Sequence, residues 1–276
     1  MSAYHDQISK MVWSFSRVKC FDNCRKEFKM NYIDKLDKAD NAFASYGLLV
    51  HELLEDYYNG KCEFFELAGR FRDEYDEKVP EDFPVLYGKD LGEGYYKAGQ
   101  DYFDHFEDDF CSYKVLGVEE QIKMDIGGYP FTGFIDLVLE DADGNITIID
   151  HKSKNGFSSK REKNEYLRQL YLYSLHVHEK YGKWPVKLGF NMVRVPKIEW
   201  ADFNEEALHE AIKWFTSTIE QIHKEEKFAD KIAMSYKAAG KKLSEFKRQD
   251  FYCNSLCNMR EHCGRSQKPR DRKGRR

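Results

Sequence analysis

Apolar positions follow a helical period over most of the chain and a strand period only in its middle. Residues 14–34 and 43–58 carry apolar side chains three and four positions apart, which predicts two amphipathic helices near the N-terminus. Residues 63–110 are also largely helical in pattern. Further helices are expected over 163–181 and from about 204 to 227.

Strand character is concentrated between these helices. Residues 114–126, 129–140 and 145–152 are expected to form three antiparallel strands, because Gly127-Gly128 separates the first two and an Asp-Gly turn precedes the third. A fourth strand is expected over 186–195. The pattern therefore predicts an α/β protein with a mixed β-sheet core flanked by helices.

The chain shows no repeats and no clear linker. We expect one domain over 1–264, with a helical region at 14–110, a core at 111–200 and a helical, cysteine-containing segment at 201–264. Residues 265–276 are strongly basic and are expected to be a disordered tail. This tail either contacts phosphates or is simply solvated.

Composition narrows the class of protein. The 276 residues carry a net charge of -4, with 41% hydrophobic and 33% charged residues, which indicates a soluble globular protein. No apolar run approaches the roughly 20 residues that span a bilayer. The first ten residues lack the apolar core of a signal peptide, so a cytoplasmic protein without membrane contact is expected.

Two aspartates and a lysine on the central strands are the strongest candidates for chemistry. Asp150 and Lys152 are two positions apart and share a face of their strand, and Asp136 lies on the other arm of the hairpin. Two carboxylates and an ammonium at one sheet edge suit Mg²⁺ or Mn²⁺ and a water nucleophile, as phosphodiester hydrolysis requires. The alternative is ordinary exposed charge at strand ends.

Other candidate residues lie on the predicted helices. His51 sits inside an apolar helical pattern, where a histidine is more often packed than ligating. Gln169 and Tyr173 are four apart and share a helix face with Tyr166. Basic residues beside this helix could guide a nucleic-acid strand or be solvated charges: Lys160, Arg161 and Arg168.

Seven cysteines, an odd number in a protein expected to be cytoplasmic, argue against a disulfide framework. Three of them, Cys253, Cys257 and Cys263, follow a C-x3-C-x5-C spacing that is typical of metal or cluster ligands.

Taken in order, these motifs resemble the RecB-like branch of the PD-(D/E)XK nuclease superfamily over residues 14–264. The similar proteins are CRISPR-associated RecB-like iron-sulfur exonucleases, the AddB nuclease domain and phage relatives. The resemblance rests on a set of short motifs: the opening helix with Cys24, Gly47-x3-His51, Gly133-x2-Asp136, Ile149-Asp150-His151-Lys152, Gln169-x3-Tyr173 and the three late cysteines.

The resemblance implies a restriction-endonuclease-like fold and a role for each matched residue. It implies metal ligands from three segments: His51, Asp136, Asp150 and the carbonyl of His151. It implies catalysis or ordering of the site by three further side chains: Lys152, Gln169 and Tyr173. A glutamate on the preceding strand, Glu119 or Glu120, would support the site without an assigned ligand role.

The resemblance also implies a [4Fe-4S] cluster on four thiolates: Cys24, Cys253, Cys257 and Cys263. Relatives commonly show C-x2-C-x5-C, whereas this chain has C-x3-C-x5-C. Cys20 is a rival for the N-terminal ligand. Zn²⁺ is an alternative, with His262 as a candidate ligand.

The function implied is metal-dependent DNA cleavage, as an exonuclease on single-stranded or resected ends in recombination, repair, or phage or CRISPR DNA processing. The alternatives are a structure-specific endonuclease and a catalytically silent module that binds DNA or a partner. DNA is the expected ligand. The chain lacks the G-x4-G-K-[ST] motif of a helicase motor, so a helicase or recombination partner is compatible with this function.

Overall fold

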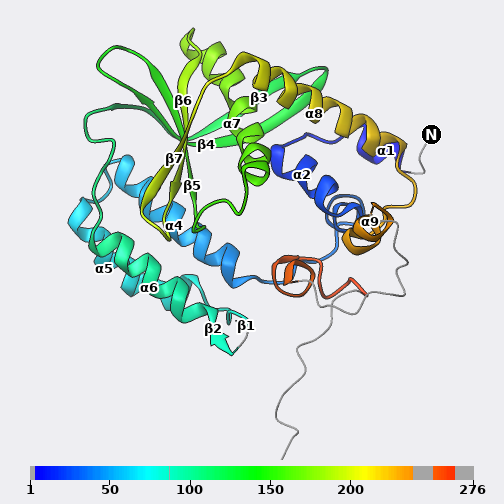
Figure 1. The fold of residues 1–276 in the computed structure, drawn as a ribbon, viewed down its shortest axis with the longest axis horizontal. Coiled ribbons are helices and arrows are strands. Elements are labelled where there is room, and N and C mark those ends of the chain that lie inside the picture. The colour runs from blue at the N-terminus through cyan, green and yellow to red at the C-terminus, as the bar shows by residue number, and fades with distance from the viewer. Residues whose placement is uncertain (1–3, 87, 239–250, 265–276) are drawn as a thin grey trace, which may run out of the picture.

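The computed structural model describes residues 4–86, 88–238 and 251–264; the basic tail at 265–276 lies outside these residues. A five-stranded mixed sheet with the order β3-β4-β5-β6-β7 forms the centre of the fold (Figure 1). Helices cover both of its faces, which confirms the predicted α/β architecture.

The first three strands of this sheet form an antiparallel meander, as predicted: β3 (Lys114–Ile126), β4 (Tyr129–Glu140) and β5 (Ile146–Lys152). Gly127 and Gly128 form the two-residue turn between β3 and β4, with φ values of 61° and 88°. A tight hairpin turn of this kind needs two left-handed residues, a conformation that glycine adopts without steric cost.

The fourth strand is parallel to its neighbour. The helix α7 (Lys160–Tyr181) crosses over the sheet between β5 and β6 (Pro185–Met192), and this crossover makes the two strands parallel. The strand was expected over 186–195, and the observed strand ends three residues before that predicted end. The chain then turns into β7 (Lys197–Asp202), an antiparallel edge strand that the sequence pattern did not predict.

Two sets of helices enclose the sheet (Figure 1). One face is covered by α2 (Phe15–Asn23), α7 and α8 (Glu205–Lys224), whose apolar side chains join those of the strands in the largest buried cluster. The other side holds three further helices, which pack on one another through a second cluster: α4 (Ala42–Tyr58), α5 (Leu67–Lys78) and α6 (Leu91–Asp104).

The first predicted helix is interrupted. Cys24 adopts an extended conformation with φ -156°, so α2 ends there and α3 (Arg25–Phe28) begins, followed by a π-helical turn at Lys29–Ile33. The Cys24 thiol caps α3 by accepting a hydrogen bond from the Glu27 amide. A cysteine side chain here takes the place of the usual oxygen cap.

The remaining elements are short: α1 (His5–Ile8), η2 (Phe64–Glu66), β1 (Val85–Leu86), β2 (Lys89–Asp90), α9 (Lys231–Ala238) and η4 (Tyr252–Leu256). The last of these lies beside the α2–α3 region, so that segments from both ends of the chain meet (Figure 1). Across the described residues, no helix is long and apolar enough to cross a bilayer.

Candidate active site and cysteine pocket

The two aspartates and the lysine meet at the end of the β4–β5 hairpin. Lys152 Nζ lies 2.5 Å from Asp150 Oδ2, so these two side chains share a face of β5 as predicted. Asp136 on β4 accepts a hydrogen bond of 2.7 Å from the backbone amide of His151. Asp150 is only 3% exposed, which makes this an acidic site withdrawn from solvent.

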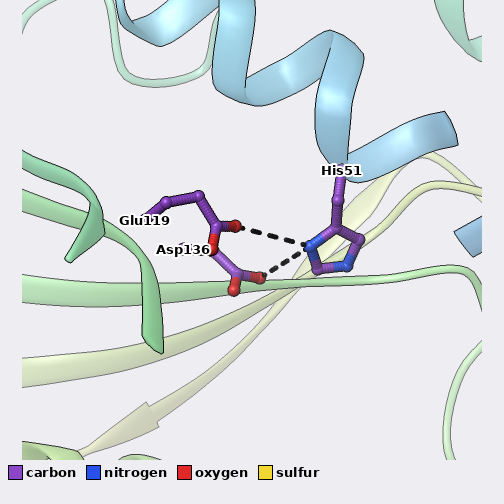
Figure 2. Close-up of side chains that lie close together, drawn as sticks. All are labelled: His51, Glu119 and Asp136. Atoms are coloured by element: carbon purple, nitrogen blue, oxygen red, sulfur yellow. Dashed lines mark ion pairs between the residues drawn. The ribbon is translucent and has the colours of Figure 1, made fainter. Parts of the chain in front are cut away.

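His51 reaches this site from α4, a helix 100 residues earlier in the chain. Its Nδ1 lies 3.5 Å from Asp136 Oδ2, and Figure 2 shows the ring pointing at the carboxylates. Its Nε2 donates a hydrogen bond of 2.9 Å to the carbonyl of His151. That bond holds the proton on Nε2 and turns Nδ1 toward the acids, an arrangement typical of a metal-ligating histidine.

Glu119 is the functional candidate to which the sequence assigned no ligand role. Its Oε1 lies 3.9 Å from His51 Nδ1 (Figure 2). One ligand atom each from His51, Glu119 and Asp136 falls within 4.8 Å of the other two, and this is the one such group among the described residues. Glu120 has a different role, because its carboxylate pairs with His176 and Lys180.

The backbone of Glu119 is strained. Its φ of 46° lies in the left-handed region, where residues other than glycine and asparagine are uncommon. Its neighbours Val118 and Glu120 pair normally with Leu137 and Ile135. The strain is therefore local, and it accompanies the placement of this one carboxylate against His51.

The electrostatics of the site favour a bound cation. Burial, together with repulsion from Asp150, raises the pKa of Asp136 to about 7. Burial disfavours the charged form of His51, but Glu119, Asp136 and Asp150 outweigh it and raise the pKa of His51 to about 9. In the absence of a metal a proton on His51 compensates the acids, and a divalent cation could replace it.

His151 is held in a neutral state behind the site. Burial, then the charges of His51 and Lys152, place its pKa well below the usual range. Asn191 Nδ2 donates to His151 Nδ1 at 3.0 Å and to the Tyr102 hydroxyl at 2.9 Å. These contacts hold His151 in place. Its backbone amide donates to Asp136, and its carbonyl accepts from His51.

Gln169 and Tyr173 approach the site from α7. Lys152 Nζ donates to Gln169 Oε1 at 3.4 Å, and Gln169 Nε2 donates to the Tyr173 hydroxyl at 3.0 Å. The two side chains therefore share a helix face, as predicted. Their hydrogen bonds orient the ammonium of Lys152.

A broad cleft opens beside Lys152, Gln169 and Tyr173, between α2, α7 and α8. Its wall carries basic side chains: Lys19, Lys152, Lys154, Arg161, Arg168 and Lys231. It also carries aromatic ones: Phe15, Tyr32, Phe134, Tyr166 and Trp214. Among the basic residues expected to guide a strand, Arg161 and Arg168 line this cleft, and Lys160 is not part of its lining.

A second, small pocket brings together the four cysteines singled out as cluster ligands: Cys24, Cys253, Cys257 and Cys263. Two methionines, Met30 and Met259, make part of its wall apolar. Cys24 Sγ accepts hydrogen bonds from the amides of Glu27 and Lys231, at 3.5 and 3.2 Å. These amides favour the thiolate, but burial outweighs them and raises the pKa of Cys24.

Neither rival ligand lines this pocket. Burial raises the pKa of the Cys20 thiol well above its usual range, and it also raises the pKa of Cys24, so acidity does not distinguish the two thiols. His262 bonds the Asp37 carbonyl at 2.9 Å.

Comparison with known proteins identifies the family. Residues 12–264 match the sequence profile of the PD-(D/E)XK nuclease superfamily. The chain belongs to this superfamily. Membership of the PD-(D/E)XK nucleases indicates a metal-dependent phosphodiester hydrolase, and the group formed by His51, Glu119 and Asp136 gives it a candidate metal site.

Other comparisons add less to the PD-(D/E)XK assignment. No curated protein matches the chain. A solved structure titled "Crystal structure of SSO0001" is 15% identical, with a TM-score of 0.29, over 63% of this chain and 85% of that one. A TM-score this low does not establish a shared fold.

Proposed function

We propose that this protein is a deoxyribonuclease of the RecB-like branch that degrades single-stranded or resected DNA from its ends, with residues 1–264 acting as one nuclease domain. The observation that carries the proposal is the convergence of His51, Glu119 and Asp136 within 4.8 Å, beside the Asp150–Lys152 pair. A helicase or recombination partner would supply the opened strands.

The donor set fits Mg²⁺ or Mn²⁺. Carboxylate oxygens and one imidazole nitrogen are ligands that these ions accept, and like-charged acids held out of water need a cation. His51 Nδ1, Glu119 and Asp136 would hold the ion, with Asp150 completing the acidic site. A cation bound there would polarise the phosphate and lower the pKa of a bound water.

Lys152 acts in this scheme as a cation and not as a base. Burial disfavours its charge, but Asp150 and Asp136 outweigh burial and raise its pKa. A protonated lysine cannot remove a proton from water. It can balance the charge that develops on the phosphate, and Gln169 and Tyr173 keep it in position for that task.

A cleavage assay tests the proposal. Wild type should degrade linear single-stranded DNA with Mg²⁺ or Mn²⁺, and Asp150→Ala and Lys152→Ala should lose about two or more orders of magnitude in rate. Lys97→Ala, an exposed lysine on α6, serves as the control and should keep full activity. Equal rates in all four proteins would reject a catalytic role for this site.

Circular single-stranded DNA separates the proposed exonuclease from a structure-specific endonuclease. An exonuclease leaves circles intact, whereas an endonuclease cuts them. The aromatic lining of the cleft supports single-stranded DNA as the substrate, because exposed bases stack on such side chains. Phe134, two positions before Asp136, is 49% exposed and available for this contact.

We also propose that Cys24, Cys253, Cys257 and Cys263 bind a [4Fe-4S] cluster that joins the two ends of the nuclease domain. A zinc ion with Zn–S bonds of about 2.3 Å requires its sulfur atoms about 3.8 Å apart. Across the described residues, no three of these thiols have their sulfur atoms all within 4.8 Å of one another. Zn²⁺ on the same four thiolates stays the alternative to the cluster.

A further inference from the structure

Lys19 on α2 occupies an unusual position in the wall of the cleft. Its side chain lines the cleft, yet its ammonium is covered and has no hydrogen-bond partner among the described residues. Lys19 Nζ lies 3.0 Å from the centre of the Tyr166 ring. The centre of the Phe15 ring lies 5.5 Å from Lys19 Nζ. A buried cation that has aromatic rings and no hydrogen-bond acceptor as its nearest partners is poorly compensated for its lost hydration.

Two more lysines surround the same ring. Lys154 Nζ lies 4.7 Å and Lys152 Nζ 5.5 Å from the centre of Tyr166. Tyr166 is three residues before Gln169, so all three ammonium groups gather directly beside the proposed catalytic face of α7. Three like charges around one ring repel one another.

The acidic groups around this cluster have other partners. Asp150 pairs with Lys152, and Glu162 pairs with Lys154. Glu165 pairs with Arg161 at 2.9 Å. Lys19 is therefore the cation of the cluster for which the described residues offer no ion pair.

This arrangement makes the Lys19 ammonium more acidic than that of an ordinary lysine. Burial, then repulsion from Lys152 and Lys154, lowers the pKa of Lys19 to about 7 despite the nearby Glu165 and Glu162. An anion placed among the three ammonium groups would reverse that shift. The flexible stem of Lys19, which already lines the cleft, lets the ammonium turn toward such an anion.

We propose that Lys19 and Lys154 form a subsite for a second backbone phosphate of DNA, adjacent to the cleaved phosphate on which Lys152 acts. This inference rests on the proposed nuclease function and adds to it a residue from α2. The subsite would set the register of the strand, because a phosphate anchored there presents its neighbour to the Asp150–Lys152 pair.

Single-turnover cleavage of oligonucleotides that each carry one neutral methylphosphonate linkage tests the subsite. In wild type, one linkage next to the cleaved bond should slow cleavage about tenfold when it is made neutral. Lys19→Met, which keeps the length and removes the charge, should be about tenfold slower on natural DNA and should show no further slowing at that linkage. Lys19→Arg should restore both rate and sensitivity.

Several outcomes would overturn the subsite. One is a Lys19→Met rate on natural DNA equal to that of Lys97→Ala, and another is an undiminished methylphosphonate effect in Lys19→Met. A flat methylphosphonate scan in wild type also rejects the subsite, even if the variants fail to fold. In each of these cases the nuclease function stands, whereas wild type that cleaves no DNA with Mg²⁺ or Mn²⁺ rejects both.

Discussion

The ring of Tyr173 packs directly against the backbone of Gly133. A Cβ atom on Gly133 would stand 2.8 Å from Tyr173 Cε1, closer than real Cβ atoms come to any neighbour. Tyr173 in turn bonds Gln169, which bonds Lys152. Two motifs that lie far apart in the sequence therefore fit together as one surface. The absence of a side chain at Gly133 allows Tyr173 to pack there and to hold the proposed catalytic face of α7 in place.

Gly133→Ala should displace Tyr173 and disorder Lys152. We expect a fall in cleavage rate of about tenfold or more, because a shift of about 1 Å at a catalytic group has costs of this order. Steady-state cleavage of linear DNA measures the effect. Gly69→Ala on α5 is the matched control, since a Cβ there meets nothing within 4 Å and the rate should not change.

A double mutant locates the cause. If the added methyl acts through Tyr173, then Gly133→Ala should cost little in a Tyr173→Ala background. Strictly additive losses would show that Gly133 acts through other contacts.

Metal binding should release protons. His51 has a pKa of about 9 and must lose its proton to become a ligand, so Mn²⁺ affinity should rise about tenfold per pH unit up to about pH 9. Below about pH 7, where Asp136 also takes up a proton, the dependence should become steeper. Calorimetry in buffers of different ionisation enthalpy counts the protons released.

His51→Gln should bind Mn²⁺ more weakly and lose the pH dependence between 7 and 9. His105→Gln, which alters an exposed histidine on the loop after α6, should behave as wild type. An affinity that is independent of pH in wild type would contradict His51 as a ligand.

Two substitutions of Glu119 should separate its backbone strain from its role in metal binding. Glu119→Gly relieves the left-handed backbone, so it should be about 1 kcal/mol more stable than Glu119→Ala in urea unfolding. Both variants lose the carboxylate and should bind Mn²⁺ about tenfold more weakly.

The corresponding pair at Glu140 provides the control for this comparison. Glu140 lies at the end of β4 without a positive φ, so Glu140→Gly should be less stable than Glu140→Ala. The same order at Glu119 would mean that its backbone is not strained.

The cysteine pocket predicts a visible chromophore. Protein purified without oxygen should show a broad absorption band that is lost in Cys24→Ser and Cys257→Ser and retained in Cys20→Ser and in Cys111→Ser, which alters an exposed thiol. The variants that lose the band should also lose roughly 2–4 kcal/mol of stability, because the link between distant segments is gone. A colourless protein with one zinc ion per chain would contradict the cluster.

The central sheet and much of the site could be predicted from local patterns. Turn glycines and alternating apolar residues define the β3–β4–β5 meander, and the spacing of Asp150 and Lys152 defines a shared face. The edge strand β7 was not predicted, although Lys197, Ile198, Glu199 and Trp200 alternate polar and apolar side chains. Its pairing with β6 is a tertiary contact that local sequence does not express.

Glu119 and Lys19 could not be singled out for a related reason. Each looks like an ordinary charged residue in its own segment, and only the packing of distant elements makes it unusual. Glu119 on β3 has a left-handed backbone, and its carboxylate lies beside His51 of α4. The burial of Lys19 depends on Tyr166 of α7. The break at Cys24 likewise follows from its side chain capping α3.

The cysteine pocket can form only late in the synthesis of this protein. Cys24 leaves the ribosome more than two hundred residues before Cys263, and the pocket needs both. The nuclease sheet can therefore form during translation, whereas closure of the pocket waits until the chain has been synthesised through residue 263. A nascent chain that stalls between residues 153 and 262 would carry every proposed metal ligand of the cleavage site and still lack the proposed link between its ends.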